Sequence, residues 1–218
     1  MNPLNHESAY RGDAAMKALA SARLCVCGAG AVGSTIADAL ARQGVRSLRV
    51  IDRDRVEPHN TAAQVYLAEH AGQWKVEALK DLLFRAAGVE IEAVRRELTA
   101  ENAQKLLAGA GLVIDGFDNS AARRAVAEAS AALSLPCLHV GLNADYGEIR
   151  WNERYRVPGD PPPGADICDY PLARNLVQIV TGVAADVIVR FLVDGAKEDY
   201  SVTLKDRTIN REDTPVPA

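Results

Sequence analysis

Apolar residues along the chain follow two spacings that replace each other in turn. Runs of neighbouring apolar residues predict five buried strands, at residues 23–28, 47–52, 89–98, 112–116 and 136–142. Between them, apolar residues recur every three or four positions and predict helices, at residues 31–43, 74–88, 100–111 and 120–134. Strands and helices that alternate over short links predict an α/β fold, with a Rossmann-like, mostly parallel sheet and helices on both faces.

The pattern changes after Leu142. Residues 144–158 predict one or two antiparallel strands, and a loop with three consecutive prolines follows. The apolar segment 172–192 predicts a long helix, and residues 199–205 predict an edge strand. We therefore expect C-terminal antiparallel strands and a long helix in addition to the parallel sheet.

Segment 172–192 is the longest apolar region of the chain. Polar and charged residues interrupt it at Arg174, Gln178, Asp186 and Arg190. A membrane-spanning helix needs about 20 predominantly apolar residues. We interpret the segment as a buried amphipathic helix, and we expect no membrane partner.

Length and composition suit a single globular domain. The chain has 218 residues, of which 48% are hydrophobic, so we predict one domain over 1–218, with a helical segment at 1–22 and a mobile tail at 206–218. The net charge of −4, without a basic block, argues against a nucleic-acid partner. The N-terminal residues lack the apolar core of a signal peptide, and the few cysteines fit a reduced chain, so we expect a cytoplasmic protein.

The sequence GAGAVG lies between the first predicted strand and its helix. Gly28 permits a tight turn, Gly30 lets a phosphate approach the backbone, and Gly33 lets the helix pack closely on the strand. Asp52 ends the second strand, where a carboxylate can accept hydrogen bonds from ribose hydroxyls. The pattern favours nucleotide binding over a turn that only packs. It does not distinguish NAD from ATP, because both carry ribose and phosphates.

Four stretches in the same order resemble the ThiF/MoeB/HesA superfamily, the bacterial relatives of ubiquitin-activating enzymes. They are GAGAVGS, IDRDRVEPHN, GQWKVEAL and VIDGFDNSAARR, and the resemblance runs from about residue 23 to 195. It implies a homodimer that binds ATP and magnesium and attaches AMP to a carboxylate, with release of pyrophosphate. The carboxylate in this family is usually the C-terminal glycine of a ubiquitin-like or sulfur-carrier protein.

The resemblance also implies roles for individual residues. By position, Asp52 would hold the ribose, Asn60 and Lys75 the phosphate region, and Asp118 the magnesium ion. The remaining members of the implied nucleotide-binding set are Asp54, Gln64, Asn119 and Arg123, the last two also supporting the loop of Asp118.

The chemistry of these residue types agrees with the implied reaction. A carboxylate and a triphosphate repel each other, so a fixed cation such as Lys75 and a metal ion must screen their charges. Asp118 offers the oxygen ligand that magnesium prefers. Each residue also has an ordinary structural explanation. Lys75 alone would be a solvated helix residue, and Asp118 or Asn119 alone would be a helix N-cap.

The sequence departs from the family pattern at Ala63. Relatives carry an arginine there that meets the phosphates of ATP, while Gln64 is kept. We expect another arginine to replace it, with Arg55 and Arg11 as candidates.

The cysteines give a second departure. Many relatives hold zinc with two C-x-x-C pairs, which this chain lacks, so we predict no structural zinc. Cys168 stands where relatives have a cysteine that can join the carrier protein covalently. It is a candidate catalytic residue, or simply a small apolar side chain.

Three functions remain open from the sequence. The first is an ATP-dependent adenylyltransferase. The second is a nucleotide- or carrier-binding module without activation chemistry, which Ala63 favours. The third is a NAD-dependent oxidoreductase, which would leave Lys75 and Asp118 without a role.

Overall fold

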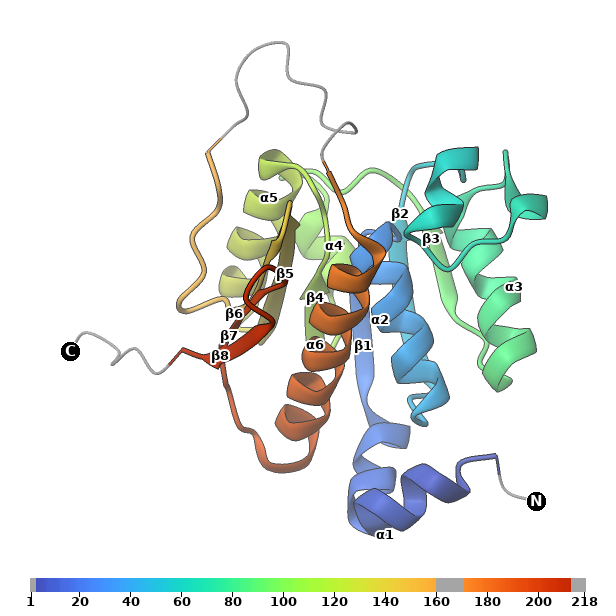
Figure 1. Cartoon of the computed structure of the whole chain (residues 1–218), viewed down its shortest axis with the longest axis vertical. Helices are drawn as coiled ribbons and strands as arrows, with labels where there is room; N and C mark the ends of the chain where they lie inside the picture. The colour runs from blue at the N-terminus through green and yellow to red at the C-terminus, as the bar shows by residue number, and fades with distance from the viewer. Residues whose placement is uncertain (1–2, 160–170, 213–218) are drawn as a thin grey trace.

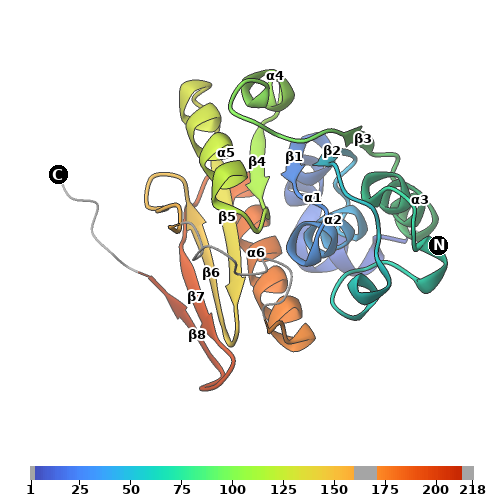
Figure 2. The ribbon, with the colours of Figure 1, turned by 90° about the horizontal axis from the view of Figure 1, so that it is seen from above.

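The described residues build one mixed sheet, flanked by helices. A computed structural model describes residues 3–159 and 171–212. Its strands follow the order β3-β2-β1-β4-β5-β6-β7-β8 in an eight-stranded sheet (Figures 1 and 2). The strands are β1 (Arg23–Cys27), β2 (Ser47–Asp52), β3 (Glu92–Arg95), β4 (Leu112–Asp115), β5 (Cys137–Asn143), β6 (Tyr146–Trp151), β7 (Tyr200–Thr203) and β8 (Thr208–Arg211). Neighbouring strands pair in parallel along the part β3-β2-β1-β4-β5 and antiparallel along the part β5-β6-β7-β8. This confirms the predicted fold class.

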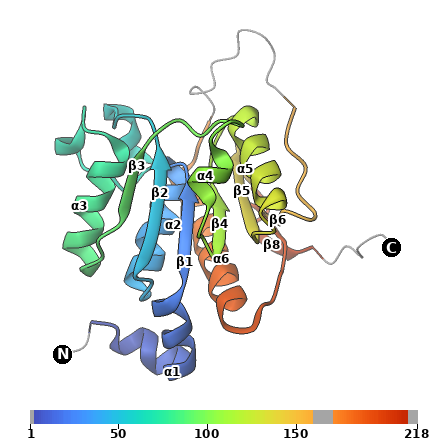
Figure 3. The ribbon, with the colours of Figure 1, turned by 180° about the vertical axis from the view of Figure 1, so that it is seen from behind.

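Helices cover both faces of the sheet, as expected. They are α1 (Asn5–Ser21), α2 (Ala31–Arg42), α3 (Lys75–Ala87), α4 (Ala103–Leu107), α5 (Ser120–Ala132) and α6 (Arg174–Asp194), with the 3-10 helices η1 (Pro58–Ala62) and η2 (Ala68–His70). Seen from above, α2, α3 and α6 lie on one face and α4 and α5 on the other (Figure 2). From behind, α4 and α5 lie in front of the sheet and α1 lies at the amino end of β1 (Figure 3).

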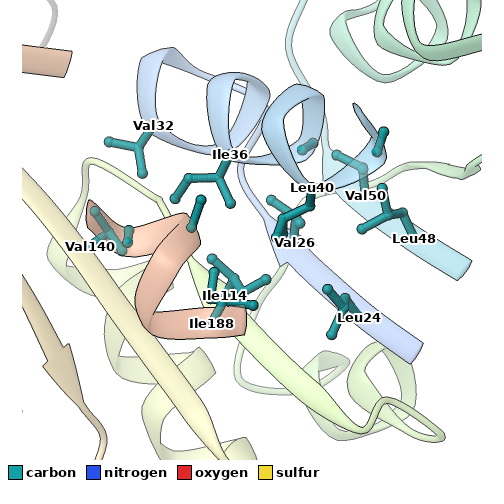
Figure 4. Close-up of a cluster of buried hydrophobic side chains, with 14 of the residues drawn as sticks. Leu24, Val26, Val32, Ile36, Leu40, Leu48, Val50, Ile114, Val140 and Ile188 are labelled. Atoms are coloured by element: carbon teal, nitrogen blue, oxygen red, sulfur yellow. The ribbon is translucent and has the colours of Figure 1, made fainter. Parts of the chain in front are cut away.

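The largest part of the core lies between the sheet and the helix pair α2 and α6. Ile36 and Leu40 of α2 are fully buried because their four-residue spacing puts them on one helical face. They pack above Val26 of β1 and Ile114 of β4, and Ile188 of α6 closes the cluster from the side (Figure 4). This packing fixes the start of α2 above the carboxyl end of β1.

The long helix α6 is apolar enough by length and mean hydropathy, 2.0 over its best window, to cross a membrane. Half of that window is buried inside the fold. Leu176, Val180, Ala184 and Ile188 are buried at a regular spacing of four residues. Packing in the core therefore accounts for the apolar residues of this helix. The absence of a membrane partner stays a prediction.

Two elements on the outer part of the parallel sheet are shorter than expected. β3 covers only Glu92–Arg95 of the predicted strand 89–98, and α4 only Ala103–Leu107 of the predicted helix 100–111. A side-chain turn starts α4 late, because Asn102 Oδ1 accepts the backbone N–H of Thr99 at 2.9 Å. Such local side-chain bonds compete with helical ones.

The C-terminal part of the sheet differs most from the prediction. We expected a mobile tail from residue 206, but Thr208–Arg211 forms β8 and pairs antiparallel with β7. β7 is therefore an inner strand and not the edge, and residues 144–158 supply a single strand, β6. All of β8 is exposed, so it carries no apolar alternation that a sequence pattern can detect. Residues 213–218 lie outside the described part.

Candidate active site

The glycine loop joins β1 to α2 at the carboxyl edge of the sheet. Gly28 has φ +91°, a conformation that favours glycine. A Cβ on Gly33 would lie 1.8 Å from the carbonyl oxygen of Gly28, so the helix and the strand touch there. A Cβ on Gly30 would meet nothing within 4 Å. α2 starts at Ala31 without a side-chain cap, which leaves its first N–H groups available to an anion.

Asp52 ties the end of β2 to this loop. Its Oδ2 accepts the backbone N–H of Ala29 at 2.7 Å, and its Oδ1 accepts that of Asp54 at 2.7 Å. Burial raises the pKa of Asp52, and the nearby charge of Lys75 and the two N–H groups offset part of that rise. A carboxylate has about four acceptor positions, so these two bonds leave room for a ribose hydroxyl.

Lys75 is the first residue of α3, and its side chain is only 11% exposed. Its Nζ lies 3.5 Å from Oδ2 of Asp54, and its backbone N–H donates to the carbonyl of Asp54 at 2.9 Å. The explanation of Lys75 as a solvated helix residue is therefore wrong. A largely buried ammonium, held next to the end of β2, is a fixed positive charge at this edge.

The segment before Lys75 is joined to the loop after β2. Val56 exchanges backbone hydrogen bonds with Gly72 and Gln73. Trp74 lies between two guanidinium groups, with the Cζ of Arg55 3.8 Å and that of Arg95 4.4 Å from its ring centroid. This stacking was not predicted, because it joins three separate segments. It holds the residue that precedes Lys75 in place.

Tyr66 is a second residue that sequence reasoning missed. Its buried hydroxyl lies 2.8 Å from the carbonyl oxygen of Ala29 in the glycine loop and 3.3 Å from that of Lys75. It therefore connects the glycine loop to the start of α3. An aromatic residue in the short stretch of small residues after Asn60 was the available signal.

Asn60 and Gln64 lie in and just after η1, beyond the end of β2. Asn60 is 8% exposed, and its Oδ1 accepts the backbone N–H of Glu57 at 2.9 Å. Gln64 donates its backbone N–H to the carbonyl of Asn60, and its Oε1 is buried without a hydrogen-bond partner among the described residues. The side-chain oxygen of Asn60 thus shapes the loop.

Asp118 and Asn119 follow β4 in a turn that packs on the glycine loop. A Cβ on Gly116 would lie 3.1 Å from the backbone nitrogen of Gly33. Asn119 is the N-cap of α5, since its Oδ1 accepts the N–H of Ala122 at 2.9 Å. Asp118 is exposed, and among the described residues its side chain has one weak contact, at 3.5 Å, with the amide of Asn119. The capping role thus falls to Asn119, and the carboxylate of Asp118 stays available.

We expected Arg123 at this edge of the sheet, but its side chain points into the core. It is 7% exposed, and its guanidinium donates to the hydroxyl of Tyr155 at 3.0 Å and to the carbonyl of Val140 at 2.9 Å. The same group lies 3.6 Å from Asp115, whose Oδ2 also lies 2.8 Å from His139 and whose Oδ1 accepts the backbone N–H of Phe117 at 3.1 Å. Its guanidinium is thus engaged in the core beside the turn after β4, and its expected role in nucleotide binding stays a prediction.

The cysteines and a metal site are the remaining subjects of the sequence predictions. Cys168 lies outside the described residues. Cys25, Cys27 and Cys137 are buried. Within residues 3–159 and 171–212, no group of three His, Cys, Asp or Glu side chains is placed to hold a metal ion. The absence of structural zinc stays a prediction.

The chain is similar in sequence to curated proteins. The sulfur carrier protein ThiS adenylyltransferase of Bacillus subtilis is 31% identical over 140 residues, 62% of this chain and 42% of that protein. The sulfur carrier protein adenylyltransferase of Thermus thermophilus is 32% identical over 168 residues, 71% of this chain and 62% of that protein. The chain thus spans about half the length of these curated relatives.

Solved structures show the same fold. E. coli MccB with ATP superimposes with a TM-score of 0.78 at 16% identity, over 97% of this chain and 71% of that chain. The ThiF family matches residues 5–216, nearly the whole sequence. The chain therefore belongs to the ThiF family.

Proposed function

We propose that the chain is an adenylyltransferase that binds ATP and magnesium at the carboxyl edge of the sheet and activates a carboxylate. Membership of the ThiF family supports this proposal. The observation that carries it is Lys75, a largely buried ammonium next to the glycine loop and Asp52. A triphosphate carries more negative charge than the pyrophosphate of a dinucleotide, so a fixed cation at this place favours ATP over NAD.

The chemistry assigns a task to each side chain. The N–H groups at the start of α2 bind phosphate, Asp52 accepts the ribose hydroxyls, and Lys75 attracts the triphosphate. An oxygen of the substrate carboxylate attacks the α-phosphorus. The bond between that phosphorus and the oxygen bridging to the β-phosphate breaks, and its electron pair leaves with pyrophosphate. The product is an acyl-AMP.

The residues present fit a magnesium ion. Asp118 is exposed, carries only the weak contact with Asn119 within the part of the chain that the structure describes, and follows β4 beside the glycine loop. Magnesium usually takes one or two carboxylates and completes its shell with water and phosphate oxygens, so a single carboxylate suffices. A bound magnesium ion would neutralise part of the phosphate charge.

The proposed substrate is the C-terminal glycine of a ubiquitin-like or sulfur-carrier protein. The names of the two curated relatives support this class of substrate. We also propose that residues 1–218 act as a single cytoplasmic domain without nucleic-acid partners. Ala63 favours the alternative of a binding module without activation, and pyrophosphate exchange separates the two.

Calorimetry with ATP and magnesium tests the proposal. We expect Lys75→Ala and Asp118→Ala each to weaken ATP binding by about tenfold, because each removes a charge-assisted contact worth about 1.5 kcal/mol or more. Lys80→Ala is the matched control for Lys75, since Lys80 lies on the same helix in an exposed pair with Glu90. Asp52→Ala does not discriminate, because both candidate nucleotides carry ribose.

Pyrophosphate exchange with candidate carrier proteins then tests the chemistry. We expect exchange in the wild type and its loss in both variants. Tight NAD binding that neither Lys75→Ala nor Asp118→Ala changes would contradict the proposal. ATP binding without exchange for any carrier protein would support the binding module instead.

A further inference from the structure

A triphosphate carries more negative charge than Lys75 alone can offset. At the place where relatives carry an arginine, this chain has Ala63, directly after η1. The backbone carbonyls of this loop and the small side chain of Ala63 supply no positive charge. A guanidinium must therefore come from another segment if the site is to hold the β- and γ-phosphates as firmly as ATP turnover needs.

Neither arginine suggested by the sequence fills this place in the structure. Arg55 stacks on Trp74 and donates to the carbonyl of Gly72 at 2.5 Å. Arg11 is 13% exposed, bonds Glu7 at 2.6 Å and lies on α1. α1 precedes the amino end of β1, at the opposite edge of the sheet from the glycine loop (Figures 1 and 3).

The start of α6 supplies a different guanidinium. Arg174 is the first residue of α6 and is exposed. Its Nη1 donates to the carbonyl oxygen of Ala62 at 2.9 Å, across 112 positions of sequence. The first turn of α6 lies beside the η1 loop and the start of α2 in two perpendicular views (Figures 1 and 2). The guanidinium therefore lies on the backbone next to Ala63, in the loop that follows the carboxyl end of β2.

Among the described residues, the contact leaves most of Arg174 unused. A guanidinium has five N–H donors in a planar fork, and within residues 3–159 and 171–212 only the bond to Ala62 engages one of them. The part of the chain that the structure describes offers it no carboxylate, unlike Arg190 on the same helix, which pairs with Asp186 at 2.7 Å. The free part of the fork suits bidentate contact with phosphate oxygens.

We propose that Arg174 is the phosphate-binding arginine of this chain, supplied by α6 in place of the one missing at position 63. The proposal rests on the proposed function, since it assigns Arg174 to the β- and γ-phosphates of the same bound ATP. The bond to Ala62 orients the guanidinium before ATP arrives, so less side-chain freedom is lost on binding.

The test compares ATP with AMP by calorimetry in the presence of magnesium, because AMP lacks the β- and γ-phosphates. We expect Arg174→Ala to weaken ATP binding by about tenfold, the effect of losing a charge-assisted hydrogen bond, and to change AMP binding less than about twofold. Arg190→Ala, the control on the same helix, should leave both affinities unchanged.

A second variant separates phosphate binding from a merely structural contact. We expect Ala63→Arg combined with Arg174→Ala to recover most of the lost ATP affinity, because the guanidinium returns from the other side of the same contact. An ATP-to-AMP affinity ratio that Arg174→Ala leaves at the wild-type value would overturn the assignment of Arg174 alone. A wild type that binds ATP no better than AMP would overturn both this inference and the proposed function.

Discussion

Among single residues, Asp115 ties the turn after β4 to a buried group, because its Oδ1 accepts the backbone N–H of Phe117 at 3.1 Å. Asp115 is fully buried and lies between Arg123 at 3.6 Å and His139 at 2.8 Å. The sequence could not reveal this group, because Asp115 meets His139 only through the register between β4 and β5. The motif predicted Arg123 as support for the loop of Asp118 and the nucleotide, and it gave no sign of the buried pairing with Asp115. Gly28, Gly33, Lys75 and Asn119, whose positions depend on local turns, were foreseen better.

Asp115→Asn should lower the free energy of unfolding by about 3–5 kcal/mol, the cost of leaving the Arg123 guanidinium buried without its counter-charge. Burial alone would raise the pKa of Asp115, but Arg123 and the bond to His139 lower it below its ordinary value. The stabilisation is therefore complete above the ordinary Asp pKa of about 3.9 and is lost as the pH falls through the lower folded-state value. Urea unfolding between pH 3 and 7 measures both effects.

Asp38→Asn is the matched control for this prediction. Asp38 pairs with Arg42 one helical turn away on the surface of α2. Surface pairs of this kind contribute about 0–1 kcal/mol, so the stability of the control should stay within that range. Equal losses in the two variants would show that the Asp115 group has no special weight.

Among the elements, the turn from β1 to α2 shows how one glycine serves packing and another serves binding. Gly33→Ala should lower the free energy of unfolding by about 3 kcal/mol or more, since its Cβ would overlap the carbonyl of Gly28. Gly30→Ala should change it by less than about 1 kcal/mol, because the space is open. The same Gly30 variant should bind ATP at least about tenfold more weakly, since the methyl group occupies the approach of the phosphate. Thermal unfolding measures the stability of the two variants, and calorimetry measures their ATP binding. An equal loss of stability in Gly33→Ala and Gly30→Ala would contradict the assignment of packing to one glycine and binding to the other.

The elements that sequence patterns predicted are those with a buried face. β1, β2, β4 and β5 were foreseen because they are buried on both sides in a parallel sheet. β8 was not foreseen, because it is held by pairing with β7 and by the bond between Ser201 and Glu212, and not by burial.

For the whole molecule, the carboxyl edge of the sheet is where the candidate site residues meet. The order of strands and helices predicted that the glycine loop, Asp52 and Asp118 reach the same edge. It could not predict the meeting of Arg174 with Ala62, because that contact joins residues 112 positions apart through the packing of α6 on α2. Family resemblance indicates the site residues by their positions in the sequence. Only the packing of the helices shows that Arg174 lies next to Ala63, where relatives carry an arginine.

The oligomeric state belongs to the same scale. We predict a homodimer from the family resemblance. The apolarity of α6 is not an argument for it, because Leu176, Val180 and Ile188 are buried in the core of one chain. Sedimentation equilibrium at micromolar concentration should give twice the 23.4 kDa mass of one chain. If apolar contacts hold the dimer, raising the salt concentration should leave it intact, since salt screens only charged contacts. A single 23.4 kDa species throughout the micromolar range would contradict the prediction, and ATP binding by that monomer would show that one chain holds the complete nucleotide site.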